Sequence, residues 1–142
     1  MSVVSGGTGV RVYLICPVRG ARAEDEAWLE AYATRLRCQG HEVFYPARDN
    51  TAAKTDSFGA ALCSENCAAM RLADEVHVYW DSESKGSFFD LGMAFALGKP
   101  LVLLTAGMGG LPDYVDWCGA SCEKTMLKWP FGVRGTSGLG AG

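Results

Sequence analysis

The sequence lacks any long apolar run and any strong excess of charge. No continuous apolar segment approaches the ~20 residues that cross a bilayer, and the first ten residues lack the charged start and apolar run of a secretion signal. The formal net charge is −3 over 142 residues, and no local basic patch stands out. This balance argues against a nucleic-acid polymer or a membrane surface as partner. We therefore expect a cytoplasmic protein that binds a small molecule.

A glycine-rich dinucleotide fingerprint is also missing. No G-x-G-x-x-G follows the first predicted strand, where the chain reads CPVRGAR (16–22) instead. This loop disfavours a reductase or flavoprotein of similar topology, and we expect no cofactor.

Cysteine is well represented, with two pairs of residues spaced four apart, Cys63 with Cys67 and Cys118 with Cys122. This spacing puts each pair on one helical face, which is consistent either with metal ligands or with ordinary thiols. Zinc sites built on close cysteine pairs usually use tight turns, and both histidines lie in predicted strands. We favour reduced thiols, as expected in the cytoplasm, and no metal site. The other two cysteines are Cys16 and Cys38.

Short apolar runs alternate with segments of helical character along the chain. The segment 23–38 has acids in its first turn and arginines in its last, the charge order that the helix dipole favours. We expect a loop over 47–56, and Asp56 or Ser57 as the cap of the helix that follows. Strands are predicted at 11–16, 41–46, 75–80, 100–105 and 125–129, and helices at 23–38, 57–73, 87–98 and 112–124.

This alternation predicts an α/β fold, because each crossover helix must bury its apolar stripe on a parallel sheet. We expect a single-domain flavodoxin-like or Rossmann-like three-layer sandwich over 10–130, between a flexible N-terminus (1–9) and a disordered glycine-rich tail (131–142). Ligands of such sheets gather beyond the carboxyl ends of the strands. The loops 16–22 and 81–86 are predicted to lie at that edge.

One acid, Asp90, interrupts the otherwise apolar segment GSFFDLGMAFALGKP (86–100). We expect it in the first turn of its helix, where backbone N–H groups and the helix dipole stabilise an anion. Complementing the dipole is one sufficient reason for an acid there. The apolar neighbours favour another, because they predict a buried helix whose carboxylate faces an internal cleft. Such a carboxylate is poorly hydrated and suited to act as a nucleophile or base.

Three segments carry a resemblance to a known family: VYLICPVRGAR (12–22), ENCAAMRLADEVHVYW (65–80) and SKGSFFDLGMAFALGKPLVLL (84–104). Together they make residues 11–105 similar to the nucleoside 2-deoxyribosyltransferase-like proteins. The resemblance implies cleavage or exchange of the N-glycosidic bond of a nucleoside or nucleotide. It also implies that Asp90 attacks the anomeric carbon, in the manner of retaining glycosidases.

Within this family, the sequence RGAR and the serine six residues before the acid look most like the branch that hydrolyses 2′-deoxynucleoside 5′-monophosphates. The resemblance places Ser84 on the phosphate, where Arg19 and the N–H groups around Gly86 and Ser87 would also hold a dianion. The alternative is that Ser84 is an ordinary loop serine, Ser87 an N-cap, and Arg19 and Arg22 solvated surface charges. The candidate substrate-binding residues are Cys16, Pro17, Val18, Arg19, Gly20, Ser84, Gly86 and Ser87.

The sequence departs from the family pattern at two positions. The family acid is usually Glu, so Asp90 sits back by roughly 1.5 Å, and misplacement of that order can cost ~100-fold in rate. Asn66 stands where the family commonly has an Asp, and an amide cannot act as an acid. Asp81 is a candidate for the missing carboxylate. The catalytic candidates are therefore Asp90, Asn66 and Asp81, and the alternative is an inactive nucleotide-binding module.

The resemblance also implies a homodimer or a higher homo-oligomer whose pockets borrow residues from a neighbour. Phe88, Phe89 and Trp117 are apolar enough to build such a contact, and a place in the core is an equal alternative for them. Hydrolysis by water and transfer to a second base are both consistent with the sequence.

Overall fold

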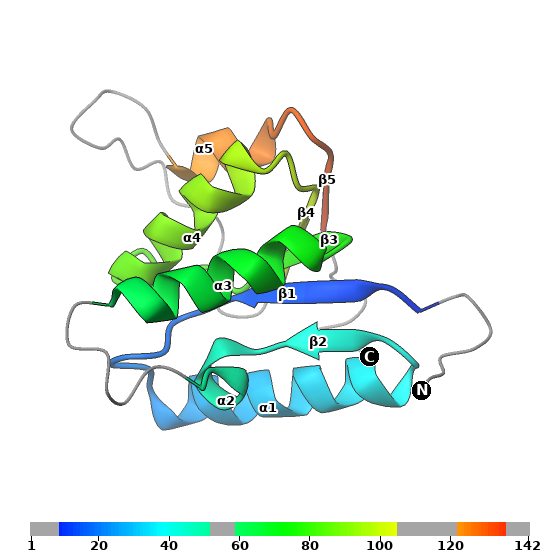
Figure 1. Ribbon diagram of the computed structural model, residues 1–142, viewed down its shortest axis with the longest axis vertical. Helices are drawn as coiled ribbons and strands as arrows, with labels where there is room; N and C mark the ends of the chain where they lie inside the picture. Colours follow the sequence, from blue (N-terminus) through cyan, green and yellow to red (C-terminus); the bar gives the residue numbers. More distant parts are fainter. Residues whose placement is uncertain (1–8, 52–58, 105–121, 136–142) are drawn as a thin grey trace.

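The computed structural model describes residues 9–51, 59–104 and 122–135, with the side chains of 122–124 excepted. Strands and helices alternate along this part of the chain (Figure 1). In order they are β1 (Arg11–Ile15), α1 (Ala23–Cys38), β2 (Glu42–Phe44), α2 (Pro46–Asp49), α3 (Ala60–Leu72), β3 (Glu75–Val78), α4 (Lys85–Ala96), β4 (Leu101–Leu103), α5 (Cys122–Leu127) and β5 (Val133–Gly135).

The strands form one parallel sheet in the order β2-β1-β3-β4-β5. In the register of the central strands, Tyr13 of β1 lies between Phe44 of β2 and Val76 of β3. This is the strand order of flavodoxin-like sheets. The predicted α/β fold with a parallel sheet is therefore confirmed.

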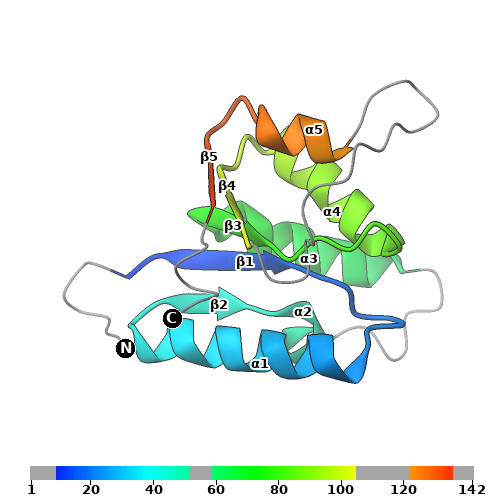
Figure 2. The ribbon, with the colours of Figure 1, turned by 180° about the vertical axis from the view of Figure 1, so that it is seen from behind.

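Alternate side chains of each strand point to opposite faces of the sheet, and different helices cover each face. Tyr13 and Ile15 of β1 pack in the core under α3, α4 and α5, whereas Val12 and Leu14 pack in the core under α1. Figures 1 and 2, which view the molecule from front and back, show α1 on one side of the sheet and α3 with α4 on the other. The molecule thus has three layers.

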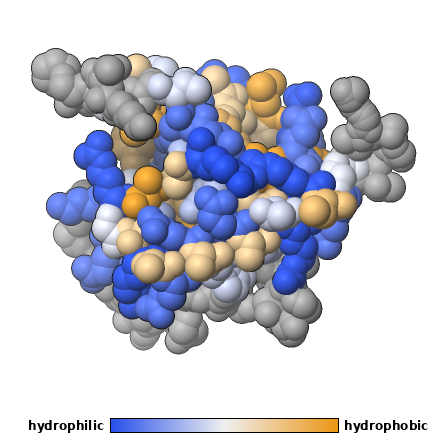
Figure 3. Space-filling view, turned by 90° about the horizontal axis from the view of Figure 1, so that it is seen from below, coloured by the Kyte–Doolittle hydropathy of each residue, from blue (hydrophilic) through white to orange (hydrophobic). Residues whose placement is uncertain are grey.

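Helix α1 spans the sixteen residues that the sequence predicts. It buries an apolar stripe that includes Leu29, Tyr32 and Leu36, and its outer surface carries charged side chains such as Glu30 and Arg35. Hydrophilic residues dominate the molecule seen from this side (Figure 3). No helix in the described part of the chain is long and apolar enough to span a membrane.

Helix α4 begins at Lys85, two residues before the predicted start, because Ser84 is its N-cap. The Ser84 Oγ accepts a hydrogen bond from the Ser87 backbone N–H at 3.3 Å. The expectation that Asp90 lies in the first turn is therefore wrong, since it is the sixth residue of the helix. The helix is also less buried than predicted, since Phe89 and Phe95 are 58% and 47% exposed.

The C-terminal elements differ most from the prediction. Residues 122–127 form helix α5 where the predicted strand over 125–129 begins. The last strand is instead β5 at 133–135, inside the segment expected to be disordered. It pairs with β4, Leu101 opposite Val133, after Gly132 turns the chain at a φ of 101°.

The loop predicted over 47–56 contains the single-turn helix α2, and α3 begins at Ala60 after Gly59. The predicted caps Asp56 and Ser57, residues 112–121 of the helix predicted over 112–124, and Trp117 lie outside the described residues.

Candidate active site

Asp90 of α4 meets Tyr13 of β1 at the face of the sheet that α3 and α4 cover. The Tyr13 hydroxyl donates to Asp90 Oδ2 at 2.9 Å across 77 positions of sequence. Tyr13 is fully buried and Asp90 is half-buried. Among the described residues, Tyr13 is the only hydrogen-bond partner of this carboxylate. The pair thus joins the middle of the sheet to the second turn of α4.

Burial raises the pKa of the Asp90 carboxyl to about 6, and the Tyr13 hydrogen bond works against that rise. The helix dipole was expected to stabilise the anion, but its effect falls off within the first turn, which Asp90 lies beyond. Burial and the neighbouring Asp90 raise the pKa of Tyr13 far above its usual value, so Tyr13 remains a donor. Asp90 is therefore an ionised, poorly hydrated carboxylate at neutral pH.

The side chains around this pair are aromatic or sulfur-bearing. The rings of Tyr13 and Phe44 stack with centroids 5.5 Å apart. Burial, followed by the charge of Asp90, raises the pKa of the Cys16 thiol to about 12, so this thiol stays protonated. Cys63 of α3 also lies near enough to act electrostatically on Tyr13. Asp90 thus lies where β1, α3 and α4 meet.

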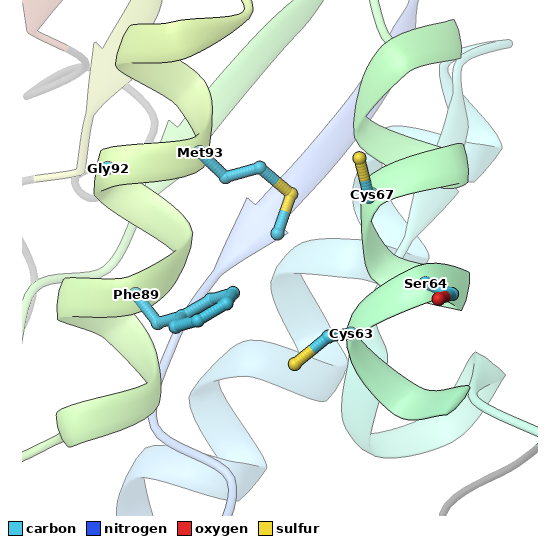
Figure 4. Close-up of a pocket in the computed structure, with 6 residues that line it drawn as sticks. All are labelled: Cys63, Ser64, Cys67, Phe89, Gly92 and Met93. Atoms are coloured by element: carbon cyan, nitrogen blue, oxygen red, sulfur yellow. The ribbon is translucent and has the colours of Figure 1, made fainter. Parts of the chain in front are cut away.

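A hollow of about 500 Å³ opens between α3 and α4. Phe89 and Met93 extend from α4 toward α3, and the Cys63 thiol points back toward Phe89 (Figure 4). Phe89 directly precedes Asp90 in the chain, but neither Asp90 nor Tyr13 lines this hollow. The lining residues are Cys63, Ser64, Cys67, Phe89, Gly92 and Met93.

The loop after β1 presents Arg19 at the surface. Cys16 and Pro17 are buried where the strand ends, whereas Val18, Arg19 and Gly20 are exposed. The Ala21 N–H donates to the Val18 carbonyl at 3.4 Å, and Gly20 has a φ of 74°, which closes a tight turn around Arg19.

Ser84, Gly86 and Ser87 lie at the start of α4, as expected. The alternative in which Ser87 is the N-cap and Ser84 an ordinary loop serine differs from what the structure has. Ser84, rather than Ser87, is the N-cap. The buried Ser87 hydroxyl donates to Ser84 Oγ at 2.8 Å. Among the described residues, no hydrogen bond or ion pair joins Arg19, Ser84 and Asp90 to one another.

Asn66 and Asp81 make hydrogen bonds to residues other than Asp90. Asn66 Oδ1 accepts from Asn50 Nδ2 at 2.7 Å. Asp81 Oδ1 accepts from the Glu83 N–H at 2.9 Å, and Asp81 acts electrostatically on Arg22 and on Tyr79, which belongs to the α1 side of the sheet. In the described chain neither side chain contacts the Asp90 carboxylate.

The described cysteines Cys16, Cys38, Cys63 and Cys67 are free thiols. No three potential His, Cys, Asp or Glu ligands cluster within the ranges that the structure covers. Cys118 and the side chain of Cys122 are outside those ranges.

The family model of the nucleoside 2-deoxyribosyltransferases matches residues 12–127. The chain belongs to this family. The match extends beyond the segment 11–105 that carries the resemblance in the sequence, and it spans β1 to α5. The two strongest signals in the sequence, the loop after β1 and the apolar helix with its single acid, both lie within it.

Solved structures resemble this chain at low sequence identity, and the two with a TM-score of 0.56 share its fold. A 2-deoxyribosyltransferase from Bacillus psychrosaccharolyticus is 21% identical with a TM-score of 0.56, over 66% of this chain and 71% of that chain. A conserved protein from Enterococcus faecalis is 16% identical with a TM-score of 0.56, over 94% of both chains. A CMP N-glycosidase from Clostridium botulinum is 23% identical with a TM-score of 0.45, over 66% of both. No curated protein matches the sequence.

Tyr13 is the residue of this candidate site that the sequence reasoning missed. It lies inside VYLICPVRGAR, but its position in a buried strand hides its hydroxyl among apolar neighbours. The only available signal was the Tyr13 hydroxyl group, because a buried tyrosine hydroxyl usually has a hydrogen-bond partner.

Proposed function

We propose that the protein cleaves or transfers at the N-glycosidic bond of a (deoxy)nucleoside or its 5′-monophosphate, with the Asp90 carboxylate as nucleophile. The observation that carries the proposal is the Asp90–Tyr13 pair. It provides a half-buried carboxylate with a pKa near 6, held by a hydroxyl at 2.9 Å, in a chain of the nucleoside 2-deoxyribosyltransferase family.

In the proposed reaction, Tyr13 holds Oδ2 while Oδ1 attacks the anomeric carbon. The C–N bond breaks, its electron pair leaves with the base, and the base takes up a proton from the proposed acid, Asp81, or from water. The resulting glycosyl ester of Asp90 is then attacked at the same carbon by water or by a second base, which frees the carboxylate. Tyr13 keeps its proton throughout, so its role is to orient and stabilise the carboxylate.

Asn66 suits a role in orienting the base. Its Oδ1 is engaged by Asn50, which leaves the Nδ2 group to donate to an acceptor atom of a substrate. An amide cannot protonate the departing base, so Asp81, in the loop 81–84 before α4, remains the proposed acid.

A 5′-phosphate would bind at the carboxyl edge of the sheet in this proposal. Arg19 supplies a cation, Ser84 supplies a hydroxyl, and the first N–H groups of α4, at Lys85 and Gly86, point out of the helix start. This arrangement favours the nucleoside 5′-monophosphate hydrolase branch. Cys16, Pro17, Val18 and Gly20 shape the loop, and the buried Ser87 steadies Ser84.

The second candidate function is a nucleotide-binding module without turnover. Two observations favour it: the carboxylate of Asp90 is shorter than the Glu usual in the family, and Asn66 replaces the family's common Asp. Binding would then use Arg19 and Ser84 as above, but no base would be released.

Both candidates are tested by incubating the protein with each deoxynucleoside and each 5′-monophosphate and quantifying free base by liquid chromatography. Base release, together with a glycosyl adduct on the α4 peptide in rapidly quenched samples, supports the enzyme. Saturable binding measured by calorimetry, with no base above the protein-free control, supports the module. Base release that persists in Asp90→Asn removes Asp90 from the mechanism.

The exposed side of α4 supports a homodimer or a higher homo-oligomer. Phe89 and Phe95 are exposed on it, and Gly92 leaves open space where a side chain would stand. Phe88 takes the alternative place in the core, with its ring against Trp80 at 4.9 Å. Light scattering tests this proposal with Phe89→Ser, which should lower the mass if α4 forms the contact. A wild-type monomer refutes it.

A further inference from the structure

The first turn of α1 contains a second buried carboxylate, Asp25, on the opposite face of the sheet from Asp90. Asp25 is 5% exposed. Its Oδ1 accepts from the Tyr79 hydroxyl at 2.6 Å, and its Oδ2 accepts from Arg22 Nε at 3.0 Å. A buried charge is costly unless it is paired and hydrogen-bonded, and these contacts meet that condition.

These contacts join the carboxyl end of β3 to the end of the β1–α1 loop. Tyr79 directly follows β3, and its N–H donates to the Ile15 carbonyl of β1 at 2.8 Å. Arg22 is the N-cap residue of α1 and the last residue of the loop. Asp25 therefore fixes where the loop re-enters the fold, while buried Pro17 fixes where it leaves.

Between these fixed ends lies the tight turn that carries Arg19. Of the two loop arginines, Arg22 is already paired with Asp25 and with Glu24, at 3.0 Å and 3.8 Å. Arg19 has no ion-pair partner among the described residues and is exposed. Arg19 is therefore the loop arginine that is available to bind an anion. Its position depends on the two fixed ends of the loop, at Pro17 and at Arg22.

We propose that Tyr79 and Asp25 are positioning residues that hold Arg19 toward the 5′-phosphate of the substrate and so set the preference for nucleotides over nucleosides. This inference rests on the phosphate part of the proposed function. Neither residue touches the substrate. They act through the loop, since weakening their contact frees the Arg22 end of the turn.

The chain offers a matched control for this inference in Tyr32. Its hydroxyl also makes a 2.6 Å contact, to His77 Nδ1, on the same face of the sheet. Both tyrosine rings pack on Trp28. Tyr32 lies ten residues after Arg22 on α1, about 15 Å along the helix from the loop. Tyr32→Phe therefore removes an equivalent buried contact without touching either loop anchor.

The experiment measures binding by calorimetry in the Asp90→Asn protein, so that turnover does not interfere. For each variant, the affinity for a deoxynucleoside 5′-monophosphate is divided by the affinity for the same deoxynucleoside. We expect Tyr79→Phe to lower this ratio by about tenfold, since it loosens a charge-assisted phosphate contact, and Tyr32→Phe to leave it unchanged. With Arg19→Ala already present, Tyr79→Phe should lower the ratio no further. Asp25→Asn, which keeps an acceptor for Tyr79 but loses the charge that pairs with Arg22, should also lower it.

A ratio that is unchanged in Tyr79→Phe and Asp25→Asn overturns the inference. An equal drop in Tyr32→Phe, or a further drop in the Arg19→Ala background, also overturns it, because the effect would then be general or independent of Arg19. Melting curves of each variant identify loss of folding, and Asp25→Asn decides the question if Tyr79→Phe does not fold. A high ratio in a protein that releases no base would refute the proposed turnover and leave this inference standing.

Discussion

Two buried tyrosine–aspartate pairs lie on opposite faces of the sheet and differ in how their carboxylates are held. Tyr79 donates to Asp25 at 2.6 Å and Tyr13 donates to Asp90 at 2.9 Å. The Tyr79 hydrogen bond, with help from Arg22, lowers the pKa of Asp25. Burial raises the pKa of Asp90 to about 6 despite its tyrosine.

The difference shows that one hydroxyl is not enough to keep a buried carboxylate acidic. Asp25 lies in the first turn of its helix and pairs with a cation, so its charge is satisfied within the fold. Asp90 lies in the second turn and, in the described chain, has no cation and one hydrogen bond. Its charge is therefore only partly satisfied, which is the condition a nucleophile needs before substrate arrives.

The largest expected effect that separates the pairs is on turnover. Asp90→Asn should reduce the rate of base release by about 10³-fold or more, as for other lost nucleophiles. Asp25→Asn should reduce kcat by less than about tenfold, because its effect falls on nucleotide binding. Steady-state assays with a saturating nucleotide measure both. Equal losses in the two variants would mean that the pairs are not distinct in function.

The next effect is on stability. Asp25→Ala should lower the free energy of unfolding by about 2 kcal/mol, since it leaves the buried Tyr79 hydroxyl without its partner and removes a helix-start contact. Urea denaturation at pH 7 measures this loss. The pKa of Asp25 is lowered in the folded state, so its stabilisation is present above the unfolded pKa and is lost as the pH falls through the folded one. The deficit of the variant should accordingly shrink in acid.

Asp90→Asn should have the opposite sign and raise the free energy of unfolding by about 1 kcal/mol at pH 7. The folded pKa of about 6 lies above the unfolded value, so the folded protein loses stability as the pH rises between the two. Asparagine keeps the Tyr13 contact and removes that loss. The gain should therefore disappear near pH 4, and a gain that is constant with pH would contradict the raised pKa.

The smallest expected effect is a shift in the pH profile. Base release should fall by roughly tenfold per pH unit below pH 6, because protonated Asp90 is not a nucleophile. In Tyr13→Phe this acidic limb should move to higher pH, since the lost hydrogen bond favours the ionised carboxylate. Profiles of kcat/KM for the two proteins test this. A limb that stays in place would mean that Tyr13 does not tune Asp90.

Local patterns in the sequence predicted the sheet and its first helices well. Charge order and apolar spacing placed α1 at its observed bounds. The start of α4 was missed because two serines three positions apart, Ser84 and Ser87, are equal candidates for the cap, and only the fold shows which one the helix uses. The strand predicted over 125–129 was wrong because its apolar residues Met126 and Trp129 are buried on α5 and just after it, whereas β5 is short and held by pairing with β4.

The site was predictable only in part, for a similar reason. Asp90 stood out as the one acid of an apolar helix, and the loop around Arg19 stood out beside a strand end. The partner Tyr13 is separated from Asp90 by 77 positions. Its role depends on which face of β1 it occupies, and periodicity in a fully buried strand does not reveal that. The position of Asp90 in its helix was misplaced by two residues, because the helix begins at Lys85 rather than at Ser87.

The alternation of side chains along β1 has an evolutionary consequence. Substitutions at Tyr13 or Ile15 change the core on the face of the sheet that carries the proposed nucleophile, whereas substitutions at Val12 or Leu14 change only the core under α1. Selection for a new substrate can therefore act on every second residue of one strand. The residues between them can be substituted as long as the core under α1 stays well packed.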